Sequence, residues 1–281
     1  MAAQTAQEPR GGSVVEPLTG SAIVAQDLAA SYGSHRVWSR ARFAIPSGSF
    51  TAILGPNGAG KSTLIRMILG QLAPAAGRLE VLGQQPRRGN PNIGYVPQGS
   101  AFDPELSIRG RDFVDLGVDG HRWGVRLGGR HKAAALASGA IDAVGASGYA
   151  DRALGSLSGG EQQRLMLAQA LVGQPRLLLM DEPLSHLDVR NQGAIVQLIT
   201  HVARERNLTV LLIAHDVNLL LPHIDLVLYM AHGRLAMGKP AEIITSERLT
   251  EIYSSPVEVL TDSRGRVFVV GLEEEVSHPH A

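Results

Sequence analysis

A glycine-rich loop between an apolar segment and a helix-like segment constrains the fold of this chain more than any other feature. Residues 49–54 (SFTAIL) are apolar and β-prone, and they run directly into the loop at residues 55–60. Apolar side chains then recur at helical spacing over residues 62–69. Such a loop turns backbone N–H groups and a helix N-terminus toward one point, so this order of segments predicts a phosphate-binding site.

The loop also carries the side chains that a bound nucleotide needs. It fits the pattern G-x-x-x-x-G-K-[ST] with Gly55, Pro56, Asn57, Gly58, Ala59, Gly60, Lys61, Ser62 and Thr63. With ATP and Mg²⁺ as cofactors, Lys61 is predicted to reach the β- and γ-phosphates, and the Ser62 hydroxyl to bind the metal. A glycine-rich turn without a ligand is the alternative. Only three of the 26 basic residues are lysines, which favours a specific role for Lys61.

Two carboxylates follow a second apolar segment. Residues 177–180 (LLLM) read as a buried strand, and Asp181 and Glu182 come directly after it. In phosphate-loop ATPases an aspartate at such a strand end holds Mg²⁺, and a neighbouring glutamate can polarise the attacking water. Taken without the phosphate loop, this pair could equally be two solvated carboxylates at the end of a strand. Together with the phosphate loop, the pair predicts Asp181 as a metal ligand and Glu182 as the catalytic base.

Composition and patterning narrow the fold class. The 281 residues include 26 acidic and 26 basic side chains and no cysteine, which argues against bulk attraction to nucleic acid and excludes disulfides. No apolar run approaches the roughly 18 residues that span a bilayer. Alternating strands and helices predict an α/β fold with a mainly parallel sheet. We expect a helical insertion at about residues 99–170 and flexible tails at residues 1–20 and 273–281.

Local patterns predict the elements around these motifs. Helices are expected at residues 132–144, 161–172, 192–206, 217–221 and 241–252. Antiparallel strand pairs are expected at residues 226–230 with 234–237 and at residues 257–260 with 267–270.

Further motifs carry a family resemblance. Residues 157–164 (LSGGEQQR) precede the acidic pair and resemble the signature motif of ATP-binding cassette (ABC) proteins. Three other segments resemble further motifs of that family and stand in the family's order. Residues 95–98 (YVPQ) resemble the Q-loop, residues 184–188 (LSHLD) resemble the D-loop, and residues 213–216 (IAHD) resemble the switch-histidine motif. Tyr32 stands where the family places an aromatic residue that stacks on adenine. The resemblance covers residues 22–245.

The resemblance implies a phosphate-loop NTPase core over residues 21–272, with an antiparallel β subdomain and the helical insertion. It implies that two copies pair head to tail around ATP. Ser158, Gly159 and Gly160 of one copy are then expected to close on the γ-phosphate held by Lys61 of the other.

The same resemblance assigns the remaining roles. Gln98 is expected to contact Mg²⁺ and the attacking water, and His215 to reach the γ-phosphate. Asp188 is expected to couple the two sites across the interface, and Glu182 to act as the base.

The resemblance also implies partners. A chain without membrane spans is expected to work with separate transmembrane permease subunits at the cytoplasmic face of the membrane, and with an extracytoplasmic substrate-binding protein. No nucleic-acid partner is expected. Residues 99–108 are expected to contact the permease through Phe102 and Leu106, and packing of these two inside the insertion is the alternative.

Short sequence segments that are less specific than the motifs above indicate the cargo. Residues 93–98 (IGYVPQ), a leucine-rich segment after His215 and residues 253–257 (YSSPV) are most similar to cassettes that import zinc or manganese. Siderophore or haem import shares these features, and an exporter with a separate permease also stays open. A soluble non-transport ATPase is disfavoured because no heptad repeat separates Gln98 from Ser158. The C-terminal residues 273–280 (EEEVSHPH) are read as a solvated tail rather than a metal site.

Overall fold

The computed structural model describes residues 20–33, 35–99, 102–118 and 130–271. The predicted tails at residues 1–20 and 273–281 lie almost wholly outside the described residues, which include only Gly20 of the first. Within the described ranges, no helix combines the length and the apolar character that crossing a membrane requires.

A six-stranded sheet forms the centre of the molecule, and its strand order is β5-β6-β7-β3-β8-β9. The first five strands are parallel, and β9 closes the sheet as an antiparallel hairpin with β8. The bounds are β3 Phe50–Leu54, β5 Ile93–Val96, β6 Leu177–Asp181, β7 Thr209–Ile213, β8 Leu226–Ala231 and β9 Arg234–Gly238. Every residue of β3, β6 and β7 is buried, as expected for parallel strands covered on both faces. The predicted α/β fold with a mainly parallel sheet is confirmed.

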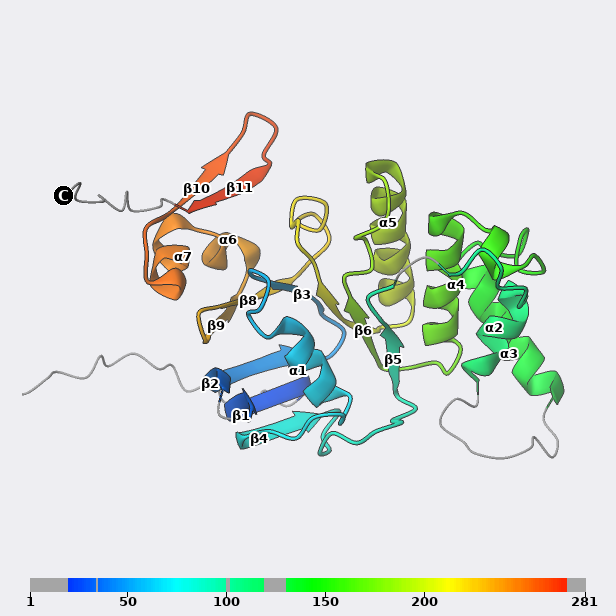
Figure 1. The fold of residues 1–281 in the computed structure, drawn as a ribbon, viewed down its shortest axis with the longest axis horizontal. Coiled ribbons are helices and arrows are strands. Elements are labelled where there is room, and N and C mark those ends of the chain that lie inside the picture. Colours follow the sequence, from blue (N-terminus) through cyan, green and yellow to red (C-terminus); the bar gives the residue numbers. More distant parts are fainter. Residues whose placement is uncertain (1–19, 34, 100–101, 119–129, 272–281) are drawn as a thin grey trace, which may run out of the picture.

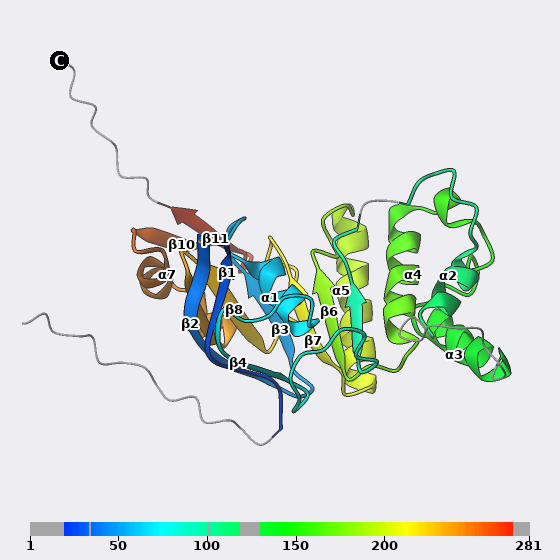
Figure 2. The same ribbon diagram turned by 60° about the horizontal axis from the view of Figure 1, so that its bottom comes forward.

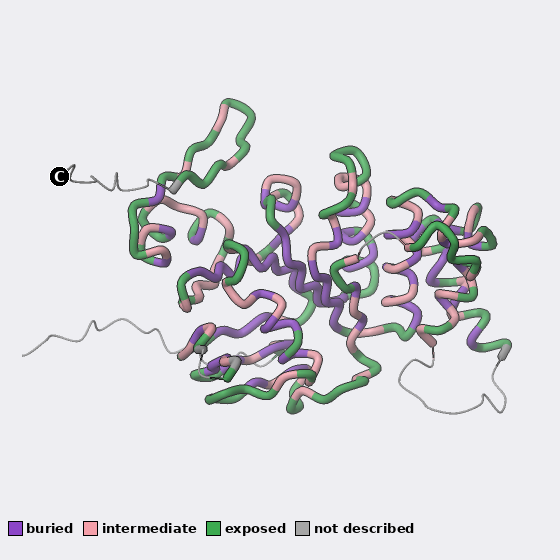
Figure 3. The backbone as a smooth tube through the Cα atoms, in the orientation of Figure 1, coloured by how far each residue is buried: buried purple, intermediate pink, exposed green. Residues whose placement is uncertain are grey.

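Two hydrophobic clusters cover the two faces of this sheet. Along β3, Ala52 belongs to one cluster and Ile53 to the other, because successive side chains of a strand point to opposite faces. One cluster includes α4 and α5, and the other includes α1 and the antiparallel sheet. Figure 3 shows the central strands as the most continuously buried part of the chain.

The antiparallel sheet has the order β2-β1-β4 and lies beside α1 (Figure 1). Its strands are β1 Ser21–Tyr32, β2 His35–Pro46 and β4 Ala76–Val81, and α1 is Lys61–Ile68. Trp38 of β2 is 1% exposed and packs in the same cluster as Leu64 and Ile65 of α1. The helix that follows the phosphate loop is therefore held between two sheets.

Helices dominate the predicted insertion at residues 99–170. The elements are α2 Gly110–Leu116, α3 Arg130–Ala143, the 3₁₀ helix η1 Leu154–Ser156 and α4 Gly159–Leu171. Val114, Ile141 and Leu165 bury their side chains where α2, α3 and α4 meet. The long helix α5, Val189–Glu205, lies between this group and the centre of the sheet (Figures 1 and 2).

Two helix predictions in the C-terminal part are wrong. Residues 218–221 form turns, and the Asp216 side chain before them accepts a hydrogen bond from the Asn218 N–H at 2.8 Å, as is typical of a local turn. The single helix expected at residues 241–252 is split into α6 Pro240–Ile243 and α7 Ser246–Tyr253, because Thr245 caps a new helix through the Arg248 N–H. The predicted strand pair is present as β10 Val257–Thr261 and β11 Val267–Gly271.

Candidate functional site

The phosphate loop has the backbone shape that the sequence predicts. Gly55, Gly58 and Gly60 have φ angles of 136°, 79° and 91°, in the region that favours glycine. A Cβ at Gly55 would lie 1.9 Å from the carbonyl oxygen of Met230, so this position excludes any side chain. The loop borders a cavity of about 340 Å³, lined by Val37, Asn57, Gly58, Gly60, Lys61, Ser62, Thr63 and Glu182.

Lys61 begins α1 and folds back over the loop. Its Nζ donates hydrogen bonds to the carbonyl oxygens of Gly55 at 2.8 Å and of Pro56 at 2.9 Å. Burial lowers the pKa of Lys61, while the charges of Glu182 and Asp181 act in the opposite direction. The ammonium group is therefore held by the loop carbonyls at the cavity, and the charges of two carboxylates act on it.

Ser62 and Asp181 bring two hard oxygen donors together. The Ser62 hydroxyl donates to Asp181 Oδ1 at 3.3 Å, and the aspartate is 6% exposed. Burial raises the pKa of Asp181, and the bond from Ser62 partly offsets this effect. A hydroxyl and a carboxylate at the mouth of a phosphate site are the ligand types that Mg²⁺ takes, so these residues fit the metal. Among the described residues, no group of three or more His, Cys, Asp or Glu side chains forms an all-protein metal site.

Glu182 is held between two other side chains. Gln98 Nε2 donates to Glu182 Oε2 at 2.9 Å, and His215 Nε2 lies 2.8 Å from Oε1. The three residues follow the carboxyl ends of the neighbouring parallel strands β5, β6 and β7. This edge is where open α/β sheets bind ligands. The predicted residues Gln98, Glu182 and His215 therefore meet at one point beside the phosphate loop.

The residues of the signature motif lie elsewhere. Ser158 caps the N-terminus of α4 in a capping box, in which its N–H and hydroxyl both donate to Glu161 Oε2 at 2.8 and 2.9 Å. Ser158 and Gly159 are exposed, and Gly160 is half-buried. Figures 1 and 2 both place α4 and α1 on opposite sides of β6. The signature motif is therefore separated from the phosphate loop of its own chain.

Asp188, like Ser158, caps the N-terminus of a helix. It caps the N-terminus of α5, where its carboxylate accepts from the Asn191 N–H at 2.9 Å and from Asn191 Nδ2 at 2.7 Å. These bonds are the main cause that lowers the pKa of Asp188. The side chain is exposed, so it is accessible to a second molecule.

Comparisons with known proteins agree with these motifs. A family model described as ABC transporter matches residues 38–185. The zinc import ATP-binding protein ZnuC of Halorhodospira halophila is 35% identical over 250 residues, which cover 86% of this chain and 89% of that protein. This chain belongs to the ABC transporter family. Its cassette is a transport ATPase that binds ATP, as the sequence motifs predict.

Two further matches cover nearly all of the cassette. The manganese transport system ATP-binding protein MntB of Halalkalibacterium halodurans is 33% identical over 89% of this chain and 98% of its own length. Among solved structures, a chain described as a metal-chelate type ABC transporter in an inward-facing conformation matches with a TM-score of 0.75 and 28% identity. That match covers 91% of this chain and 99% of the solved chain.

Sequence reasoning missed one residue of the nucleotide cavity, which is Val37. Val37 lines the cavity, and the next residue, Trp38, is buried with its Nε1 also close to Gly60 of the phosphate loop. No local pattern indicates Val37, because its place in the cavity depends on how β2 packs against the phosphate loop. Tyr32 ends β1, where its backbone pairs with His35, and its proposed contact with adenine stays a prediction.

The two apolar residues expected at the permease contact have different surroundings. Phe102 packs edge-on against Phe113 of α2, with 5.2 Å between the ring centroids, so it belongs to the insertion. Leu106 is 37% exposed and is available to a partner. The alternative of internal packing therefore holds for Phe102.

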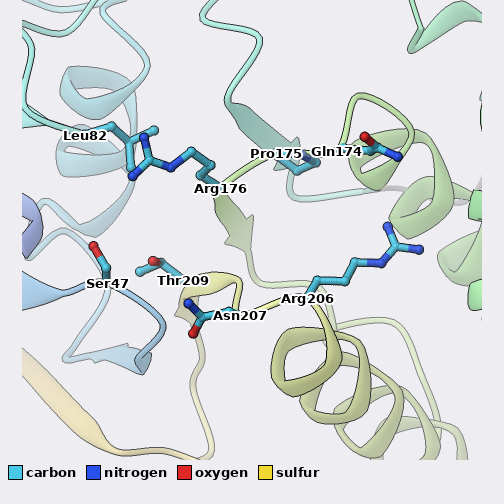
Figure 4. A pocket seen from close by; sticks show the side chains of 8 residues that line it. All are labelled: Ser47, Leu82, Gln174, Pro175, Arg176, Arg206, Asn207 and Thr209. Carbon is cyan, nitrogen blue, oxygen red and sulfur yellow. The ribbon is translucent and has the colours of Figure 1, made fainter. Parts of the chain in front are cut away.

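A second cavity of about 480 Å³ lies at the opposite edge of the sheet, where β6 and β7 begin (Figure 4). Its lining consists of Ser47, Leu82, Gln174, Pro175, Arg176, Arg206, Asn207 and Thr209. Arg176 and Arg206 extend in different directions, as Figure 4 shows, and the Thr209 hydroxyl accepts a hydrogen bond from the Gly48 N–H at 2.9 Å. None of the predicted site residues lines this cavity, so it is separate from the ATP site of the cassette.

Proposed function

We propose that Glu182 is the base for ATP hydrolysis at the edge of the sheet formed by β5, β6 and β7. The observation that supports this role is the placement of its carboxylate, which accepts from Gln98 and lies 2.8 Å from His215 Nε2. A carboxylate fixed in this way beside the phosphate loop can take a proton from a water aligned with the γ-phosphate. Gln98 orients the water, and His215 donates to the γ-phosphate.

Nucleotide binding uses the groups that now face the cavity. Lys61 exchanges its bonds to the loop carbonyls for the β- and γ-phosphates, and the backbone N–H groups of residues 55–63 enclose the phosphate oxygens. Tyr32 stacks on adenine. Ser62, Asp181 and Gln98 hold Mg²⁺, which supplies positive charge to offset that of the phosphates when it is bound.

A second copy completes each site. Ser158, Gly159 and Gly160 begin α4, which lies on the other side of β6 from α1 and its Lys61, so we assign them to the nucleotide of another copy. In a head-to-tail dimer, the Ser158 hydroxyl and the first N–H groups of α4 close on the γ-phosphate of the partner. Asp188, exposed at the start of α5, couples the two sites.

The cassette unit spans residues 21–272, with its helical insertion at residues 99–170.

The cassette works with separate transmembrane permease subunits at the cytoplasmic face of the membrane, together with an extracytoplasmic substrate-binding protein. It drives import of a divalent metal ion, zinc or manganese. The support for this cargo is that relatives named for zinc import and for manganese transport are 33–35% identical over 86% or more of this chain.

Import of a metal chelate, such as a siderophore or haem, is the second candidate. It is favoured by the likeness to the metal-chelate type transporter, which covers 91% of this chain. The two candidates differ in whether the permease takes a bare ion or an organic complex.

Metal content in living cells tests the cargo. We expect Glu182→Gln in the intact transporter to lower cellular zinc or manganese, measured by mass spectrometry, because ATP is bound without being hydrolysed. Glu258→Gln, a change of an exposed glutamate on β10, is the matched control and should leave both metals at the parent level. Unchanged zinc and manganese with reduced uptake of a ferric chelate would favour the second candidate. A rise in cellular metal would contradict import.

A further inference from the structure

The loop that carries His215 contains turns but no helix or strand. Residues 214–225 join β7 to β8 through bends and turns. Val217 and Leu220 are buried and anchor the middle of the loop, but the His215 side chain itself is 48% exposed. Burial alone therefore does not fix the imidazole beside Glu182.

Asn218 supplies the fixing contacts. Its Nδ2 donates to the carbonyl oxygen of Val267 at 3.0 Å, and its Oδ1 accepts from the Val267 N–H at 2.6 Å. Asn218 also donates through its backbone N–H and Nδ2 to Asp216 Oδ1, at 2.8 and 2.9 Å. One carboxamide thus joins Asp216, the residue next to His215, to Val267, which lies 49 positions after Asn218 in the sequence.

The strand that receives these bonds is itself anchored. The hairpin of β10 and β11 pairs residue by residue from Val257 with Gly271 to Thr261 with Val267. On its other edge, the Val259 N–H donates to Ser246 Oγ at 2.9 Å and the Val257 N–H to Thr250 Oγ1 at 3.0 Å. Both acceptors belong to α7, so the hairpin provides a fixed edge to which the loop is tied.

We propose that Asn218 is a positioning residue for hydrolysis, because it ties the His215 loop to the C-terminal hairpin. This inference rests on the proposed role of His215. With the tie intact, the imidazole stays within hydrogen-bond distance of Glu182 and near the γ-phosphate. When the tie is removed, the loop samples other positions, and chemistry slows although the phosphate loop is untouched.

Two variants break the tie from opposite sides: one removes both of its bonds with Val267, and the other removes only the bond from the Val267 N–H and leaves the Val267 carbonyl oxygen as an acceptor. Asn218→Ala deletes the carboxamide, and Val267→Pro deletes the N–H that donates to it. Because that N–H points out of the hairpin, proline at this edge position leaves the β10–β11 hydrogen bonds in place. Val269→Pro is the matched control, since Val269 lies two residues along the same edge and no contact with Asn218 is present there in the described structure.

Steady-state ATP hydrolysis by the assembled transporter reads out the effect. We expect Asn218→Ala to lower kcat by about tenfold and Val267→Pro, which removes one of the two bonds, to lower it by a smaller factor, with KM and ATP affinity unchanged in both. Val269→Pro should keep the parent kcat. Parent kcat in both test variants, or an equal loss in the control, would overturn the proposal. A thermal melt of each variant confirms that the fold is intact.

A double substitution separates this proposal from the role of His215. If His215→Ala alone keeps the parent kcat, the proposed role of the histidine is wrong. If His215→Ala lowers kcat and Asn218→Ala causes no further loss in that background, Asn218 acts through His215 as proposed. A further loss of about tenfold in the His215→Ala background would show that Asn218 acts independently, which would overturn the inference.

Discussion

Replacing Gly60 by alanine should destabilise the fold more than the same change at Gly58. Both glycines belong to the phosphate loop and have positive φ angles, 91° and 79°. An alanine in either place is strained by about 1–2 kcal/mol, because an L-residue disfavours this backbone conformation. The two positions differ in space: a Cβ at Gly58 meets nothing within 4 Å, whereas a Cβ at Gly60 lies 2.5 Å from Val37 Cγ1 and 2.6 Å from Trp38 Nε1.

The contact of an added Cβ at Gly60 determines how much more stability Gly60→Ala loses than Gly58→Ala. Trp38 is 1% exposed and packs in the cluster that includes Leu64, so it cannot move aside without disturbing α1. Overpacking of this kind costs about 1–3 kcal/mol. The free energy of unfolding should therefore fall by about 1–2 kcal/mol for Gly58→Ala and by about 2–5 kcal/mol for Gly60→Ala.

Urea and thermal unfolding without nucleotide measure this difference, since each kcal/mol shifts Tm by roughly 2–4 °C in a chain of about this size. Nucleotide is left out because a methyl group at either position could also touch phosphate. Equal losses in the two variants would refute the reasoning, because they would mean that Trp38 yields to the added methyl group.

Three further predictions concern turnover and assembly. Glu182→Gln should lower kcat by about 100-fold or more while ATP binding persists and traps a dimer, and hydrolysis at the parent rate would exclude Glu182 as the base. Lys61→Ala should weaken ATP binding, measured by calorimetry, because the buried ammonium group is lost from the cavity; unchanged affinity would contradict the phosphate-loop assignment. The purified cassette should sediment as a monomer without ATP, and a stable nucleotide-free dimer would contradict the proposal that nucleotide joins the two copies.

The phosphate loop was predictable because its chemistry is contiguous. Residues 55–63 contain every group that a phosphate needs, so one stretch of sequence determines the backbone angles of Gly55, Gly58 and Gly60 and the start of α1 at Lys61. Gln98, Glu182 and His215 are far apart in the sequence, but each follows a parallel strand. Because the carboxyl ends of parallel strands share one edge, the fold class predicts that such residues are neighbours. The pairing of particular oxygen and nitrogen atoms required the structure.

The failures arise where a side chain bonds to backbone. Asp216 turns the chain at residues that have helical spacing, and Thr245 begins a new helix inside a segment that was predicted as one. Both contacts are local, and residues of these types favour turns and helix caps. The tie between Asn218 and Val267 is different, because it depends on how β11 docks beside the loop. No local pattern could have indicated it.

The chemistry of Glu182 can be predicted from the sequence, but its backbone conformation cannot. Its chemistry follows from its place after β6, but its φ angle of 50° lies in the left-handed region that residues other than glycine rarely adopt. Such a conformation costs about 1–3 kcal/mol and persists only where surrounding contacts fix it. Here, Gln98 and His215 engage the two carboxylate oxygens, and the Ser185 hydroxyl donates to the Glu182 carbonyl oxygen at 3.0 Å. These contacts hold Glu182 in a backbone conformation that its residue type disfavours. The strained backbone therefore belongs to the residue that we assign as the catalytic base.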